Sequence, residues 1–147
     1  IIKQNYSKSA HFNENKDFFE ELYLNSKSLY LTEINYHFIK AICQFLNIKT
    51  NIKFSSEFDL KEERTERLLD ICLQLNGTDY YSGPAAKAYM NEDVFNKANV
   101  AIHYFDYSGY PVYHQMNEPF DHGVSILDLI FCEGKNTVEF LKFTKNE

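Results

Sequence analysis

The feature that most constrains the fold is a strand-like segment that passes directly into a helix at residues 78–89. Asp79-Tyr80-Tyr81 has the composition of a short strand, Ser82-Gly83-Pro84 forms a sharp turn, and a helical pattern begins at the proline. Such a junction leaves backbone N–H groups beyond the C-terminal end of the strand, where open α/β sheets bind ligands. We therefore expect a binding site at this turn.

Helical and strand patterns alternate along most of the chain. Apolar residues three and four positions apart predict helices at 13–25, 28–47, 61–76, from Pro84, at 91–97, and as a pair after Ser125 that is interrupted at Gly134. Strands are predicted at 48–54, 79–81 and 100–105. Strands that alternate with helices form a parallel sheet with right-handed crossovers and helices on both faces. We predict a single domain over residues 1–147, a small three-layer α-β-α fold of Rossmann-like type with a short parallel sheet.

Composition argues against several functions. The formal net charge is −6 and no long run of Lys or Arg occurs, so nucleic acid and anionic membranes are poor candidate partners. No apolar run has the length of a membrane span, and we expect no membrane insertion. The chain has 3 cysteines, an odd number, and none of them are in CxxC spacing. This pattern is typical of reduced thiols rather than of a disulfide framework. We expect a cytoplasmic protein that holds neither a metal nor a cofactor.

The turn at 82–87 has the chemistry of an anion site. Ser82, Gly83 and the first helical N–H groups point toward one place, and Lys87 adds a positive charge one turn later. Ordinary helix initiation, with Pro84 at the first position and the lysine in solvent, explains the same residues. Both interpretations stay open, and the turn has neither a GxGxxG nor a P-loop pattern that would name a nucleotide.

A second group of residues follows the predicted strand 48–54. If that strand is parallel to its neighbour, Ser55 and Ser56 lie at the same sheet edge as Ser82, and Arg67 reaches that edge as an anion clamp. An ST-turn explains the two serines, and an i,i+4 surface pair with Glu63 explains the arginine.

Residues 106–121 form an irregular, tyrosine-rich loop. Loops of this length in a compact domain are usually functional or mobile. Tyr113, His114 and Gln115 are the candidates in it: the imidazole as a general acid or base, and the amide as a reader of the reacting group. An exposed loop histidine is the structural alternative. Ser125 and Asp128 match a capping box, and we interpret them structurally rather than as part of a catalytic triad.

Seven short blocks occur in the order and spacing of a known family: Asn35, Ser55-Ser56, Glu66 to Cys72, Tyr80 to Ala86, Tyr113-His114-Gln115, Phe120, and Val124 to Phe131. Through these blocks the chain resembles the WbqC-like family from about Asn35 to Gly134. Members of that family usually also carry an N-terminal segment with His-Gln-Pro and Leu-Pro-Trp motifs, which this sequence lacks. We therefore expect the chain to be the C-terminal part of such a protein.

The resemblance implies a bacterial protein of surface-polysaccharide synthesis, of the O-antigen type. It implies a transferase that modifies a nucleotide-activated amino sugar with an acyl or aminoacyl group. The diphosphate would lie near Ser55, Ser82 and Lys87, with His114 and Gln115 at the reacting group. The alternative is a non-catalytic binding or scaffold domain of the same pathway. A fragment without its N-terminal segment would expose apolar surface, so we also expect self-association.

Overall fold

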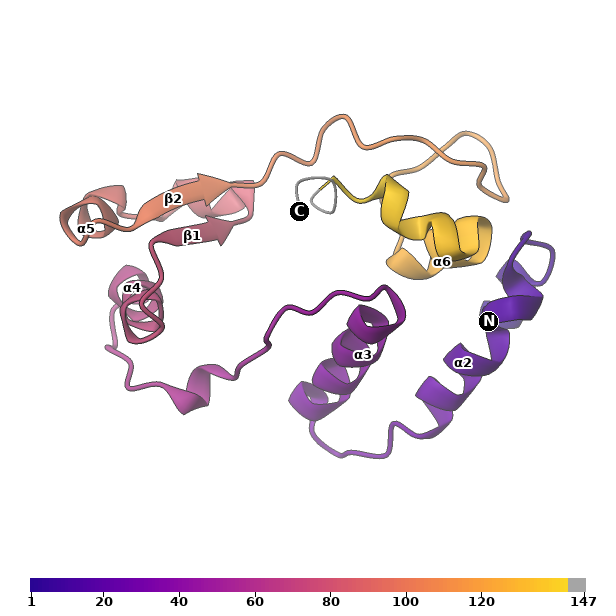
Figure 1. The fold of residues 1–147 in the computed structure, drawn as a ribbon, viewed down its shortest axis with the longest axis horizontal. Helices are drawn as coiled ribbons and strands as arrows, with labels where there is room; N and C mark the ends of the chain where they lie inside the picture. Colours follow the sequence, from indigo (N-terminus) through magenta and orange to yellow (C-terminus); the bar gives the residue numbers. More distant parts are fainter. Residues whose placement is uncertain (143–147) are drawn as a thin grey trace. The chain divides into compact units, whose positions relative to one another are not determined.

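A computed structural model describes residues 1–142 of the chain. The chain divides into two compact units (Figure 1). Unit 1 comprises Ile1–Asn51 and Gly109–Glu147, and unit 2 comprises Ile52–Ser108. Within residues 1–142, no helix combines the length and the apolar character needed to cross a bilayer.

Unit 1 is built from helices around an aromatic core. Its helices are α1 (Ile2–Tyr6), α2 (Phe12–Leu24), α3 (Leu31–Phe45), α6 (Ile126–Glu133) and the 3₁₀ helix η3 (Gly134–Phe140). The ring of Phe131 lies 5.1 Å from that of Phe19 and 5.2 Å from that of Phe12, measured between centroids. Phe19 and Phe131 are fully buried, so α6 and α2 are held together by aromatic packing.

The turn after α6 requires a glycine. Gly134 has a φ of +56°, a left-handed conformation that L side chains rarely adopt. A Cβ at this position would lie 2.6 Å from Nδ1 of His11. The glycine therefore allows the backbone to turn sharply from α6 into η3 next to the start of α2.

Unit 2 contains the sheet. Its elements are η1 (Ser55–Glu57), α4 (Arg64–Gln74), β1 (Asp79–Ser82), η2 (Pro84–Ala88), α5 (Glu92–Lys97) and β2 (Ala101–Tyr104). The strands β1 and β2 lie side by side and are parallel, with Tyr80 opposite Ile102 and Ser82 opposite Tyr104 (Figure 1). The segment from β1 through η2 and α5 to β2 is thus a βαβ crossover.

The core of unit 2 lies on one face of this sheet. Phe95 of α5 is fully buried, and Tyr80 and Ile102 of the strands pack with the same cluster. The opposite face carries Tyr81, which is 55% exposed and stacks on His103 at 4.6 Å between ring centroids. Within unit 2, the core therefore packs against the face of the sheet that carries Tyr80 and Ile102.

The prediction of an α/β fold with a short parallel sheet is confirmed. Within residues 1–142 the sheet has the two strands β1 and β2, which do not establish a Rossmann-like order.

The predicted strand 48–54 is wrong. Ile48 packs against the core of unit 1, whereas Ile52 begins unit 2, so the segment is a connection rather than a paired strand. The helix predicted from Pro84 is a short 3₁₀ helix instead.

Candidate functional site

A polar pocket with a volume of about 420 Å³ opens in unit 1. Three parts of that unit supply its walls: the end of α1, the irregular loop, and the first turn of α6. The lining residues, called here the polar pocket, are Asn5, Tyr6, Gln115, Met116, Asn117, Pro119, Asp121, Val124 and Asp128.

Asp128 supplies a buried carboxylate to the lining of this pocket. The residue is 6% exposed, and the Tyr113 hydroxyl donates to its Oδ2 at 2.7 Å. Nε2 of Gln115 donates to the same oxygen at 3.2 Å. A buried carboxylate is costly unless donors compensate for its lost water, and these two groups provide that compensation.

Gln115 also closes the loop that forms one wall. Its Oε1 accepts from the backbone N–H of Asp121 at 2.8 Å, and its Nε2 donates to the carbonyl of Asp121 at 2.8 Å. Gln115 is 8% exposed, so both ends of its amide are engaged in a dry environment. The loop from 115 to 121 is therefore fixed to the carboxylate of Asp128 by one side chain.

The hydroxyl and thiol groups around Asp128 stay protonated near neutral pH. Burial first, and then the charge of and a hydrogen bond to Asp128, raise the pKa of Tyr6 to about 12. Burial and the hydrogen bond to Asp128 also raise the pKa of Tyr113. Burial, followed by the charges of Asp128 and Glu133, raises the pKa of the Cys132 thiol to about 11. The tyrosines therefore act as donors, and the thiol is a poor nucleophile.

The lining has a distinct charge character. Of the residues that line the polar pocket, the charged ones are Asp121 and Asp128, and none is Lys, Arg or His. Amide groups and a tyrosine hydroxyl make up most of the remaining polar surface. Such a wall offers hydrogen bonds to hydroxyl and amino groups and repels a phosphate.

The structure distributes the residues predicted from the sequence over both units. Tyr113 and Gln115 belong to unit 1, where the glutamine lines the polar pocket and the tyrosine donates into it. His114, between them, is exposed. The six remaining candidates belong to unit 2: Ser55, Ser56, Arg67, Ser82, Gly83 and Lys87. Convergence of all three sequence motifs at one sheet edge stays a prediction.

Two of the unit 2 predictions change. Ser55 and Ser56 lie in η1, and the strand that was expected to place them at the sheet edge is absent from the region 48–54. Arg67 donates from Nε to the carbonyl of Lys61 at 3.1 Å and from Nη2 to that of Glu62 at 3.0 Å. Its guanidinium thus stabilises the chain that enters α4.

The predicted turn itself is present. Ser82 ends β1, Gly83 has an extended backbone, and Pro84 begins η2. Nζ of Lys87 lies 4.9 Å from the ring centroid of Tyr104, within range of a cation–π contact. This contact places the ammonium group beside β2.

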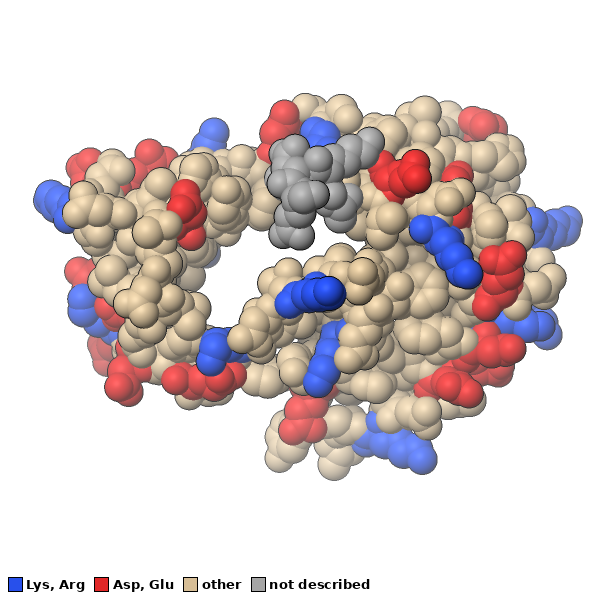
Figure 2. All heavy atoms as spheres, in the orientation of Figure 1, with Lys and Arg blue, Asp and Glu red and all other residues tan. Residues whose placement is uncertain are grey.

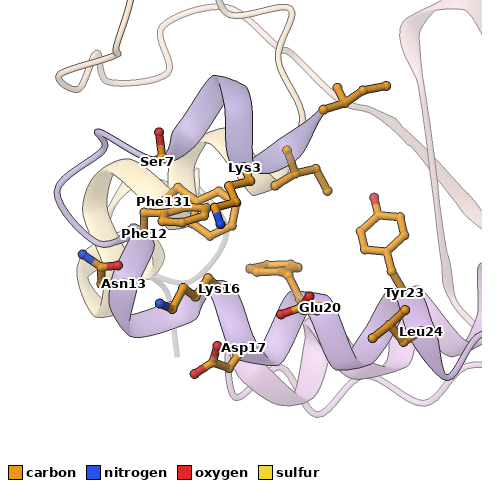
Figure 3. A pocket seen from close by; sticks show the side chains of 13 residues that line it. Lys3, Ser7, Phe12, Asn13, Lys16, Asp17, Glu20, Tyr23, Leu24 and Phe131 are labelled. Carbon is orange, nitrogen blue, oxygen red and sulfur yellow. The ribbon is translucent and has the colours of Figure 1, made fainter.

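A second hollow, the apolar groove, lies between α1 and α2 and has a volume of about 650 Å³. Figure 3 shows the adjacent rings of Phe12 and Phe131, with Lys16 and Asp17 projecting from α2. Its charged side chains are of both signs, as they are across the face of the molecule in Figure 2. The groove therefore does not indicate a ligand of one charge.

Asp128 and Tyr6 are the site residues that sequence reasoning missed. Ser125 does cap α6, because its hydroxyl accepts from the N–H of Leu127 at 3.2 Å. Asp128, interpreted as the second half of a capping box, is instead buried and bonded to Tyr113. The sequence did contain one sign that Asp128 is buried: the acid directly precedes the apolar run 129–132, in a helix that is buried on several sides.

Among residues 1–142, no three His, Cys, Asp or Glu side chains gather in the manner of a metal site.

Comparison with known proteins gives one family and one curated relative. The profile of the WbqC-like protein family matches residues 1–140. A Mycobacterium tuberculosis (strain ATCC 25618 / H37Rv) protein, "Uncharacterized protein Rv1507c", is 38% identical over 144 residues, which cover 98% of this chain. This chain spans 62% of the length of that relative. No solved structure matches the chain.

Proposed function

This chain belongs to the WbqC-like protein family, and we propose from that premise that it acts in bacterial surface-polysaccharide synthesis of the O-antigen type. Its substrate is a nucleotide-activated amino sugar. Its reaction is the transfer of an acyl or aminoacyl group, which makes it a transferase, and its place is the cytoplasm.

The polar pocket is the observation that carries this proposal. Sugars are recognised by fixed donors and acceptors that match their hydroxyl and amino groups, in a cavity of several hundred Å³. The pocket of about 420 Å³ is lined by two carboxylates, a tyrosine hydroxyl and three side-chain amides, of which that of Gln115 is already bonded to Asp121 and Asp128. The internal bonds of Gln115 to Asp121 support this role, because they hold one wall in place before a ligand arrives.

The residues of the loop have separate roles in this proposal. His114 is the proposed general acid or base, because it is exposed and adjoins a residue of the pocket. Gln115 is a positioning residue, since its amide is committed to Asp121 and Asp128. Tyr113 donates to the same oxygen of Asp128 as Gln115 and helps to hold that carboxylate in place.

Binding of nucleotide-sugars tests the proposal. We expect UDP- and dTDP-linked amino sugars to raise the melting temperature of the protein, because a ligand that binds only the folded state stabilises it. The matched control is UDP or dTDP alone, which lacks the sugar. If no nucleotide-sugar in the panel raises the melting temperature above that control, the proposed substrate is wrong.

His114→Ala tests the proposed chemistry separately from binding. The exposed side chain makes the substitution compatible with the fold, so binding should be retained while acyl transfer falls by about 10² to 10⁴. Replacement of the exposed His37 with Ala is not a suitable control, because its ring contacts Phe38 at 6.0 Å. Glu118→Ala, in the same loop and also exposed, is the better control.

A non-catalytic binding or scaffold domain of the same pathway is the second proposal. The exposed tyrosines of unit 2 favour it, since Tyr81 on β1 is 55% exposed and Tyr107, after the end of β2, is 61% exposed. Loss of a co-purifying pathway protein on Tyr107→Ala, with sugar binding unchanged, is the expected result. We also propose that the chain self-associates, which size-exclusion chromatography at several concentrations tests.

A further inference from the structure

We propose that Asp128 is the anchor for a positively charged nitrogen in the polar pocket, and that the pocket thereby selects a free amine. The inference rests on the proposed function in one respect only, namely that the nitrogen belongs to a sugar. The nature of the bound group follows from the pocket itself.

The first step is the charge of the lining. The charged groups among the lining residues are the carboxylates of Asp121 and Asp128. Oδ1 of Asp121 is used within the loop, where it accepts from the N–H of Gly123 at 2.7 Å. Asp128 is the deeper of the two, because it is buried whereas Asp121 is exposed. Its charge therefore acts at short range in a region with little water.

The second step is that the partners of Asp128 are neutral. Tyr113 donates a hydroxyl hydrogen at 2.7 Å, and Gln115 donates an amide hydrogen at 3.2 Å. Tyr6 adds a second hydroxyl. Neutral donors replace the lost hydration of a carboxylate but do not cancel its charge. An ammonium group supplied by a ligand would cancel it and form a charge-assisted hydrogen bond.

The third step is that the hydroxyl and thiol groups beside Asp128 stay protonated near neutral pH. The titratable groups that face Asp128 are Tyr6 on α1, Tyr113 and Asp121 on the loop, and Cys132 on α6. The pKa values of both tyrosines and of the thiol are raised. These three groups therefore do not change charge between about pH 6 and 9, the range in which a ligand amine with a pKa of about 8 titrates.

Selectivity follows from these three steps. A hydroxyl in place of the ammonium group can donate a hydrogen bond but leaves the charge of Asp128 uncompensated. An acetamido group is neutral and larger. A phosphate adds a second negative charge beside the carboxylates. The pocket therefore favours the free amine over each of these groups.

The test uses isothermal calorimetry with monosaccharides that differ in one substituent. The probes are glucose, glucosamine, its 3-amino and 4-amino isomers, N-acetylglucosamine, and ethylammonium chloride as an amine without a sugar. We expect at least one amino sugar to bind about tenfold to a hundredfold more tightly than glucose, the range of a charge-assisted bond. That preference should weaken as the pH rises through the pKa of the ligand amine.

Asp128→Asn provides the residue-specific arm, because it keeps the shape of the side chain and removes the charge. It should abolish the preference for the amine, so that glucose and the amino sugars bind the variant with similar affinities. Asp17→Asn is the matched control in the same unit, on the exposed face of α2. If Asp128→Asn fails to fold, the pH dependence of amine binding to the unsubstituted protein decides.

The outcomes separate this inference from the proposed function. Equal affinity for glucose and every amino sugar overturns the inference and leaves a sugar-binding function intact. If ethylammonium binds but none of the sugars does, the inference is supported, and the proposal that the bound amine belongs to a sugar is wrong. If no probe binds, the inference is overturned, whereas the proposed function is decided by the separate panel of nucleotide-sugars. An amine preference that survives Asp128→Asn assigns the anchor to another residue and also overturns the inference.

Discussion

The hydroxyl of Tyr113 makes two hydrogen bonds in the network of the polar pocket: it donates to Asp128, and it accepts from Nε2 of Gln115 at 3.2 Å. Tyr113→Phe removes the donor that lies 2.7 Å from Oδ2 of Asp128. The ring remains, and with it the edge contacts to Phe120 at 5.1 Å and Phe140 at 5.7 Å between centroids. The substitution therefore changes polarity with little change in packing volume.

The expected cost follows from the charge of the acceptor. A hydrogen bond to a charged group contributes about 1.5–3 kcal/mol to stability, more than one between neutral groups. Gln115 still donates to Oδ2 at 3.2 Å in the variant, so Asp128 does not lose all compensation. We expect the free energy of unfolding to fall by about 2 kcal/mol.

Urea denaturation near neutral pH measures this change. The midpoint should fall while the slope with urea stays constant, which indicates an unchanged extent of unfolding. Tyr30→Phe is the control, because its side chain is 71% exposed and its loss of a hydroxyl should change stability by less than about 0.5 kcal/mol. Equal stability of Tyr113→Phe and Tyr30→Phe would show that the network adds nothing to folding.

The effect of Tyr113→Phe on stability should depend on pH, and the pKa of Tyr113 gives the direction of that dependence. The pKa of Tyr113 is raised in the folded protein above the value of about 10 in the unfolded chain. Between these two values the folded state binds more protons, so stability falls as the pH rises. The contribution of the hydroxyl is thus fully present below about pH 10 and is lost above it. The difference between wild type and Tyr113→Phe should shrink in alkaline solution and stay constant from about pH 7 to 9.

Three further changes test other parts of the structure. Gly134→Ala should lower the free energy of unfolding by at least about 2 kcal/mol, because the residue has a positive φ and an added Cβ would clash with His11. The control Gly83→Ala, at a φ of −68°, should leave stability nearly unchanged. Similar losses of stability in both variants would refute the steric argument. Alkylation of the native protein at pH 8 should modify the half-buried Cys43 well before Cys132, because the raised pKa of Cys132 leaves little thiolate. Mass spectrometry of the peptides measures the order of modification, and faster modification of Cys132 would contradict the prediction. Lys87→Ala should remove the thermal stabilisation by a nucleotide-sugar if the turn of unit 2 binds its phosphates, and full retention of the shift contradicts that role.

Hydrophobic period predicted most of the regular structure correctly. The helices α3 and α4 lie inside the predicted ranges 28–47 and 61–76, and both strands lie within a residue of their predicted limits. These segments are long or are bounded by clear signals. The turn at Gly83 and Pro84 stops β1 at once, and Asn76, with a φ of +53°, follows the end of α4.

The segment 48–54 shows where this reasoning fails. Its alternation of Ile48, Thr50, Ile52 and Phe54 is a strand pattern, yet a strand needs a partner for its backbone groups. The two ends of the segment belong to different units: Ile48 packs against the core of unit 1, whereas Ile52 and Phe54 belong to unit 2. Alternation reports which side chains are buried, but it does not report whether a neighbouring strand is present.

Asp128 was missed for a related reason. Its position in the first turn of α6 gave a complete local explanation as a helix cap. The true partners, Tyr113 and Gln115, are 15 and 13 residues away in an irregular loop. Local pattern analysis has no means of pairing them, because the bonds depend on how the loop folds back over the helix.

That pairing also explains how an irregular loop can hold a defined site. The loop has little regular backbone bonding between Asp106 and Ser125, so its order must come from side chains. Gln115 fixes both backbone groups of Asp121, and Asp128 fixes Tyr113 and Gln115. Because these bonds are buried or partly buried, breaking one leaves a polar group with less compensation and weakens the others. The polar residues that shape the pocket are therefore the same ones that order its wall.

A substitution at Gln115 should affect ligand binding and loop stability together, whereas one at the exposed His114 should affect the proposed chemistry alone.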